Sequence, residues 1–190
     1  GPADTIEHTI AERLTSEYIG LKQECKERVL WKGAPVERDQ VTLVDADATW
    51  VPSNVDLPRF DADSGKLSYL IEPHPAIIAS GRVDEFLHDF GFSAIDPHIA
   101  YGITSHEPEA SPFYQRIAVH KVDDGVSERK IKKHLAAFQW GSRTEFKKRG
   151  WPGDPESFRG LLPETDYDDH GVVIIARRDI GHVTIYSKRL

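Results

Sequence analysis

The chain ends in two apolar runs that are rich in β-branched residues and joined by a short polar link. The runs are GVVIIAR, residues 171–177, and HVTIYSK, residues 182–188, with RDIG as the link. β-Branched residues favour strands, and a short link that contains glycine favours antiparallel pairing. We therefore expect a C-terminal hairpin, which commits this end of the chain to a sheet.

The segments before the hairpin alternate between strand and helix periodicity. YQRIAVHKV, residues 114–122, and RTEFKKR, residues 143–149, read as strands, and SERKIKKHLAAFQW, residues 127–140, reads as a helix. Ser127 is the expected N-cap of that helix, and Asp154 with Pro155 is expected to start a second one. The resulting order, β-α-β-α-β-β, predicts a small sheet of three or four strands with both helices on one face. The residues expected in the shared core are Ile131, Leu135, Phe138, Phe146, Phe158 and Leu161.

The first part of the chain is less regular. Residues 17–21 favour a strand, 22–31 a helix on which Cys25 and Val29 stand four apart, and 39–51 a strand, a turn and a strand. Residues 52–67 favour a loop, and 83–90 a helix that ends at Gly91. We predict an α+β fold of two parts: residues 1–110 as a mixed connector lobe, and residues 111–190 as the β-α-β-α-β-β module.

Composition narrows the class of protein. The chain has 190 residues, no methionine and a single cysteine, so it has no internal disulfide, which fits a reducing, cytoplasmic compartment. No uninterrupted apolar window of about 18 residues and no signal peptide occurs, so we expect neither membrane insertion nor export. The chain begins Gly-Pro, as protease cleavage of an expression tag would leave it, and we expect a segment of a longer protein.

Charge is distributed unevenly along the chain. The net charge is -7, but residues 1–110 hold 9 Lys and Arg against 20 Asp and Glu, whereas residues 111–190 hold 15 against 11. Such asymmetry suggests a partner for the basic part, although solvated faces can differ in charge without a partner.

No catalytic motif stands out. The sequence contains no glycine-rich dinucleotide or phosphate loop, no G-x-S-x-G and no H-E-x-x-H, so we expect no S-adenosylmethionine binding by this chain and assign no catalytic residue. Cys25 is expected to be a small buried hydrophobe. A weaker alternative is a metal or acid-base site in the loops, whose candidates are Glu72, His74, Asp96, His98 and His106.

Nucleic-acid binding is the better-supported hypothesis. Several cations come from one predicted helix and the strand after it, so they can share a surface. Gly150 lets the backbone approach a phosphate, and Trp151 offers a flat face for a base, or alternatively fixes the turn onto the helix that follows. The candidate nucleic-acid-binding residues are Lys130, Lys133, Arg143, Lys147, Lys148, Arg149, Gly150 and Trp151.

Several stretches resemble a known family. Residues 69–104, 111–119, 144–162 and 171–189, with YLIEPHPAII and EFKKRG as the most specific strings, resemble the carboxy-terminal part of bacterial class I S-adenosylmethionine-dependent methyltransferases with a THUMP-like domain. Residues 17–31 resemble the segment that follows the methyltransferase core in those proteins. The chain departs from the family at residues 151–153, where the family commonly has an aliphatic stretch.

The resemblance implies a missing upstream domain that binds S-adenosylmethionine, and an RNA-binding role for residues 111–190. We therefore predict a non-catalytic region of such an enzyme that recognises tRNA or rRNA, with the upstream methyltransferase domain as its partner in cis. The alternatives are a module that docks on that domain without contacting RNA and, less favoured, a small metal- or histidine-dependent hydrolase.

Overall fold

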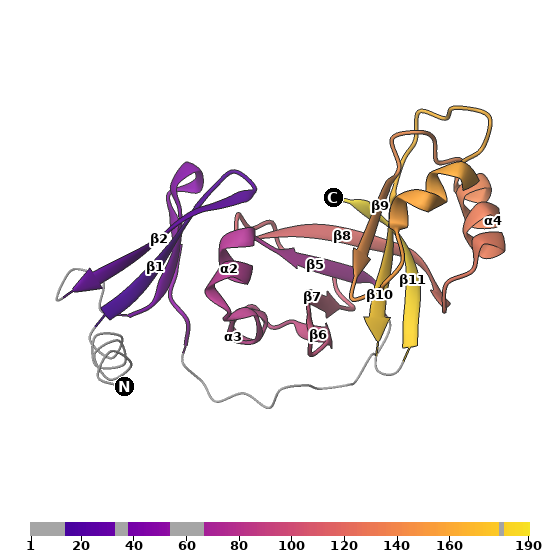
Figure 1. Ribbon diagram of the computed structural model, residues 1–190. Coiled ribbons are helices and arrows are strands. Elements are labelled where there is room, and N and C mark those ends of the chain that lie inside the picture. The colour runs from indigo at the N-terminus through magenta and orange to yellow at the C-terminus, as the bar shows by residue number, and fades with distance from the viewer. Residues whose placement is uncertain (1–13, 33–37, 54–66, 179–180) are drawn as a thin grey trace, which may run out of the picture. The chain divides into compact units, whose positions relative to one another are not determined.

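The computed structural model describes residues 14–32, 38–53, 67–178 and 181–190 (Figure 1). Contacts divide these residues into two units. The first comprises residues 14–32, 38–53, 73–91 and 111–114, and the second comprises the remainder. Both units contain strands and helices, which confirms the α+β class. Among the described residues, no helix combines the length and the apolar character needed to cross a membrane.

The first unit is a four-stranded sheet with two short helices. Its strand order is β2-β1-β3-β4, in which β1 (Leu14–Leu21) pairs antiparallel with β2 (Glu24–Lys32) and parallel with β3 (Gln40–Leu43). The 3-10 turn η1 (Val44–Ala46) leads into β4 (Ala48–Trp50), as the predicted strand-turn-strand requires. The helices are α2 (Pro75–Ser80) and α3 (Val83–Asp89), and Gly91 follows α3 with a φ of 72°.

The core of this unit lies between the sheet and its two helices. Val41, Leu43 and Trp50 are buried on the sheet, and the Trp50 and Phe86 rings meet edge to face at 5.4 Å. A Cβ atom on Gly20 would lie 2.4 Å from Leu43 and 2.6 Å from His74, so glycine is what allows His74 to approach β1.

The helix predicted for residues 22–31 is wrong, because this segment forms strand β2. Cys25 and Val29 stand four residues apart, and a spacing of four places two side chains on one face of a strand as well as on one face of a helix. The half-buried residues of β2 are Cys25, Val29 and Trp31, which follow the period of two. Cys25 is therefore half-buried rather than in a core, and burial raises the pKa of its thiol.

The second unit is built on a seven-stranded sheet with the order β6-β7-β5-β8-β11-β10-β9. In chain order its strands are β5 (Tyr69–Pro73), β6 (Ser93–Asp96), β7 (Ile99–Thr104), β8 (Tyr114–Asp124), β9 (Glu145–Arg149), β10 (Val172–Arg178) and β11 (Gly181–Arg189). Helix α4 (Glu128–Phe138) follows β8, and the 3-10 helix η2 (Pro155–Leu161) follows β9. The predicted C-terminal hairpin is confirmed by the antiparallel pairing of β10 with β11, although its residues 179–180 lie outside the described residues. So does most of the predicted loop, at residues 54–66.

This sheet is larger than the three or four strands expected from the sequence. The additional strands β5, β6 and β7 come from before residue 110 and pair onto the edge that β8 would otherwise expose. The domain boundary predicted at residue 110 stays a prediction. Strands from both sides of this position are hydrogen-bonded in the same sheet.

Helix α4 and η2 cover one face of the C-terminal strands, as predicted (Figure 1). Ile131, Leu135, Phe146 and Phe158 are buried together with Val173, Ile175 and Tyr186, and Phe138 and Leu161 pack partly buried against them. Ser127 caps α4 by accepting a hydrogen bond from the Lys130 N–H. Asp154 likewise caps the next helix through the Glu156 N–H at 3.1 Å. That second helix is 3-10 rather than α, a geometry typical of short segments.

The opposite face of the sheet is enclosed because the sheet curls and brings β6 against β10. Its core unites Leu70, Tyr101 and Ile103 on β5 and β7 with Ile174 and Ile185 on β10 and β11. The Arg177 and Asp96 side chains form an ion pair at 3.8 Å between β10 and the far edge strand β6. Side chains of β9 that point to this inner face therefore meet β5 and β7.

Candidate nucleic-acid interface

The basic side chains of strand β9 point to two different faces of the sheet. Phe146 is buried under α4 and η2, and Lys148, two residues on, is exposed. Lys147 and Arg149 alternate with them and point to the inner face, because β9 lies parallel to β10 with Lys147 opposite Ile174 and Arg149 opposite Ala176. This alternation separates Lys148 from its two basic neighbours.

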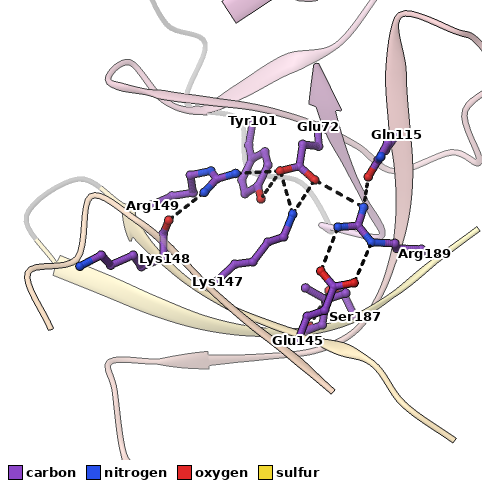
Figure 2. A network of polar contacts seen from close by, with 10 residues as sticks. Glu72, Tyr101, Gln115, Glu145, Lys147, Lys148, Arg149, Ser187 and Arg189 are labelled. Carbon is purple, nitrogen blue, oxygen red and sulfur yellow. Dashed lines mark hydrogen bonds and ion pairs between the residues drawn. The ribbon is translucent and has the colours of Figure 1, made fainter. Parts of the chain in front are cut away.

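Lys147 and Arg149 bind a carboxylate of the same unit (Figure 2). The Lys147 Nζ lies 3.0 and 3.1 Å from the two carboxylate oxygens of Glu72, and the Arg149 guanidinium donates to Glu72 Oε1 at 2.7 Å. The Tyr101 hydroxyl donates to the same oxygen at 3.2 Å, and Arg189 reaches Oε2 at 3.5 Å. We call these five residues the Glu72 cluster.

The surroundings of the cluster hold its geometry. The Arg149 guanidinium carbon lies 5.0 Å from the centroid of the Tyr101 ring, within the range of a cation–π interaction. Arg189 also donates to Gln115 and, at 3.1 and 3.3 Å, to Glu145. Every donor that faces Glu72 is thus oriented by a second contact or by the strand that carries it.

The charges of the cluster are compensated inside the protein. Burial alone would raise the pKa of Glu72, whose side chain is 13% exposed, but Lys147, Arg149 and Arg189 outweigh burial and lower it. Burial and the Glu72 carboxylate raise the pKa of Tyr101, so that its phenol stays a hydrogen-bond donor. Glu72 therefore remains ionised at neutral pH. It forms ion pairs with the cations that the sequence suggested as phosphate-binding residues.

The turn after β9 is fixed by its own contacts. Lys148 Nζ donates to the Gly153 carbonyl at 3.0 Å, and Gly150 has a φ of 73°. The Trp151 ring stacks on Phe158 with centroids 5.5 Å apart and 22° between the planes. A Cβ atom on Gly153 would lie 2.2 Å from the Trp151 ring, so the turn closes tightly on it. These contacts match the alternative in which Trp151 fixes the turn onto the next helix.

Arg143 is exposed and lies outside β9. Its guanidinium donates to the backbone carbonyl of Asp168. The structure therefore does not bring Arg143 into the Glu72 cluster.

Lys130 and Lys133 lie on the exposed side of α4, where they join cations that the sequence did not single out. A depression of about 500 Å³ between α4 and β8, the α4 depression, is lined by Lys121, Asp123, Arg129, Lys130, Lys133 and His134. The Lys121, Arg129, Lys130 and Lys133 side chains are exposed. The spacing of residues 129, 130, 133 and 134 places them on adjacent turns of a helix, a signal that could have identified Arg129 and His134. Lys121 joins them only through the packing of α4 on the sheet.

The residues of the weaker metal or acid-base alternative each have another partner. Glu72 belongs to the Glu72 cluster, and His74 caps α2 by accepting from the Ala76 N–H while its other ring nitrogen bonds the Lys22 carbonyl. Asp96 accepts from the His98 N–H at 2.8 Å, as a turn residue does. The His106 ring contacts Ser105. Within the described ranges, no three His, Cys, Asp or Glu side chains are grouped so as to hold a metal ion.

Comparisons with known proteins give a likeness of fold. No family model matches the chain, and no curated protein matches it. Among solved structures, the chain is similar to one from Porphyromonas gingivalis W83 described as a "putative methyltransferase", with a TM-score of 0.68 and 14% identity over 95% of this chain. The chain spans 47% of the length of that protein. At this level of identity, the likeness shows a shared fold.

Proposed function

We propose that this chain is the non-catalytic, RNA-recognising region of an S-adenosylmethionine-dependent methyltransferase whose cofactor-binding domain lies elsewhere in a longer protein. The fold likeness supports the association with a methyltransferase, and the similar structure is about twice as long, which leaves room for a further domain. The family resemblance of the sequence supports a THUMP-like RNA-binding module that works in cis with the methyltransferase domain.

The observation that carries the RNA proposal is the α4 depression. Four exposed cations line it together with a single carboxylate among the described lining residues, in a protein whose net charge is -7. Lys and Arg side chains in such a cluster bind backbone phosphates and release condensed counterions. RNA contact is therefore expected at Lys121, Arg129, Lys130 and Lys133, rather than at Lys147 and Arg149.

The mode of binding should be dominated by phosphates rather than by base stacking. Trp151, the predicted stacking residue, is already packed on Phe158. The large hydrophobic side chains that are most exposed in the described part of the chain are all aliphatic. Because no Phe, Tyr or Trp side chain is exposed within the described ranges, affinity should depend on salt and little on sequence.

Filter binding of bulk tRNA at several salt concentrations tests the proposal. The double change Lys130→Gln, Lys133→Gln should flatten the dependence of log affinity on log salt by about one to two units, at roughly 0.7 per lost phosphate contact. The matched control is Lys26→Gln, Lys32→Gln, which removes the same charge from exposed positions on β2. Binding that is absent, insensitive to salt, or weakened equally by the control pair would contradict RNA recognition at α4.

A docking module without RNA contact is the second candidate. The Glu72 cluster weakens the case for RNA at β9, because Lys147 and Arg149 are paired within their own unit. If the α4 cations bind the methyltransferase domain instead of RNA, the α4 double variant should lose affinity for that domain and leave tRNA retention unchanged.

A further inference from the structure

The α4 depression contains a carboxylate where an anion would bind. Asp123 is one of its lining residues, and its side chain is 11% exposed. The Tyr186 hydroxyl donates to Asp123 Oδ2 at 3.4 Å, and the Lys130 ammonium lies 3.9 Å from Oδ1. A carboxylate in this position repels phosphate and draws Lys130 toward itself, so it opposes the four cations around it.

His134 is placed to neutralise that carboxylate. Its Nε2 lies 3.2 Å from Asp123 Oδ2. The ring is held by packing, with its centroid 4.8 Å from that of Tyr186 and 5.9 Å from that of Phe138. Burial and Asp123 raise the pKa of Tyr186, so the phenol stays neutral and donates. The charged groups around His134 are therefore Asp123 on β8, Lys130 on its own helix, and the remaining lining cations Lys121, Arg129 and Lys133.

We propose that the α4 depression holds a backbone phosphate of the RNA and that the Asp123–His134 pair makes its affinity depend on pH. The inference rests on the proposed function for the identity of the ligand and extends it to the control of binding. Histidine is the side chain that ordinarily changes charge between pH 5 and 8. When His134 is protonated, it pairs with Asp123, Lys130 is released toward the phosphate, and the charge of the depression rises by one. Binding is then tighter at pH 6 than at pH 8.

Sulfate is the probe that isolates this effect. It is a tetrahedral dianion throughout this pH range, whereas a phosphate monoester itself titrates near pH 6. Calorimetric titration of the whole chain with sulfate at pH 6 and pH 8 should give roughly 30-fold tighter binding at pH 6, the factor expected when one unit charge acts on a dianion about 4 Å away in water. The Lys130→Gln, Lys133→Gln variant should lose most of the binding at both pH values.

Two substitutions test the pair, and a third is the control. His134→Gln should bind sulfate equally at the two pH values, with the affinity of the wild type at pH 8. Asp123→Asn should bind at least as tightly at pH 8 as the wild type does at pH 6. His120→Gln should keep the wild-type pH dependence, because His120 is exposed and is not among the lining residues. Should Asp123→Asn fail to fold, His134→Gln decides the question alone.

The outcomes separate the two proposals. Equal sulfate affinity at both pH values in the wild type, or a pH dependence that survives in His134→Gln, overturns the role of the pair. Sulfate binding that the α4 double variant leaves unchanged overturns the site. If sulfate binds as expected but tRNA is not retained, the anion site and its pH dependence stand and RNA recognition fails.

Discussion

Glu72 determines whether the basic side chains of β9 are available to a ligand. It accepts from Lys147, Arg149, Arg189 and Tyr101, which lie on three other strands of the same sheet. The sequence EFKKRG suggested a phosphate-binding site, yet two of its three cations are paired with this carboxylate. The functional candidates therefore shift to α4, where the cations are exposed.

We expect Glu72→Gln to lower the free energy of unfolding by about 2 kcal/mol at pH 7. Removing one partner of a fully buried ion pair costs about 3 to 5 kcal/mol and of an exposed pair at most about 1, and this cluster is intermediate. Because the folded-state pKa of Glu72 lies below the ordinary value of 4.5, its contribution is present above that pH and is lost as the pH falls through the folded-state value.

Urea denaturation between pH 3 and pH 7 measures both effects. The difference between the wild type and Glu72→Gln should be largest at neutral pH and shrink below about pH 4.5. Glu156→Gln, which removes an exposed ion pair with Arg159, serves as the control and should change stability little. A difference that stays constant over the whole range would mean that the charge of Glu72 is not what stabilises the sheet.

Strand β9 is the element on which both faces of the second unit depend. Phe146 anchors it beneath η2, with its ring centroid 6.3 Å from that of Phe158, while Lys147 and Arg149 tie the same strand to the inner face. Because the side chains of a strand alternate, one five-residue segment serves a hydrophobic core and an ionic cluster at once.

Phe146→Ala should destabilise the protein by roughly 3 to 5 kcal/mol, since it removes a buried aromatic ring and leaves a cavity. Lys148→Ala, on the same face of β9 but exposed, should change stability by less than about 0.5 kcal/mol. Thermal or chemical denaturation of the two variants provides the comparison. Similar losses for both would mean that Phe146 does not carry the packing assigned to it.

At the scale of the whole molecule, the seven-stranded sheet joins segments that are distant in sequence. The strands β5, β6 and β7 contribute Leu70, Ile95, Ile99, Tyr101 and Ile103 to the same core as the C-terminal strands. A core of this kind cannot form from residues 111–190 alone, because one face of β8, β10 and β11 would then be exposed to water.

We therefore expect the isolated fragment 111–190 not to fold, even though its local pattern is the clearest in the sequence. It loses nearly half of the inner core and leaves Lys147 and Arg149 without Glu72. Circular dichroism during denaturation should show a cooperative unfolding transition for the full chain and none for the fragment. The amide proton chemical shifts of the fragment should be poorly dispersed, as in an unfolded chain. A cooperative transition in the fragment would instead support a domain boundary at residue 110.

What the sequence by itself determined is local. The strands of the C-terminal half, the two faces of β9 and the buried stripe of α4 follow from side-chain periodicity, which acts over neighbouring residues. The caps follow from the residue types at Ser127, Asp154 and Pro155. Periodicity could not separate helix from strand at β2, because a spacing of four fits both. Only the tertiary structure decided which cations remain available, because Glu72 meets Lys147 across 75 positions of the chain and Arg149 across 77. Such pairings depend on how the whole sheet curls, and the curl is set by packing among many strands rather than by any segment of the sequence.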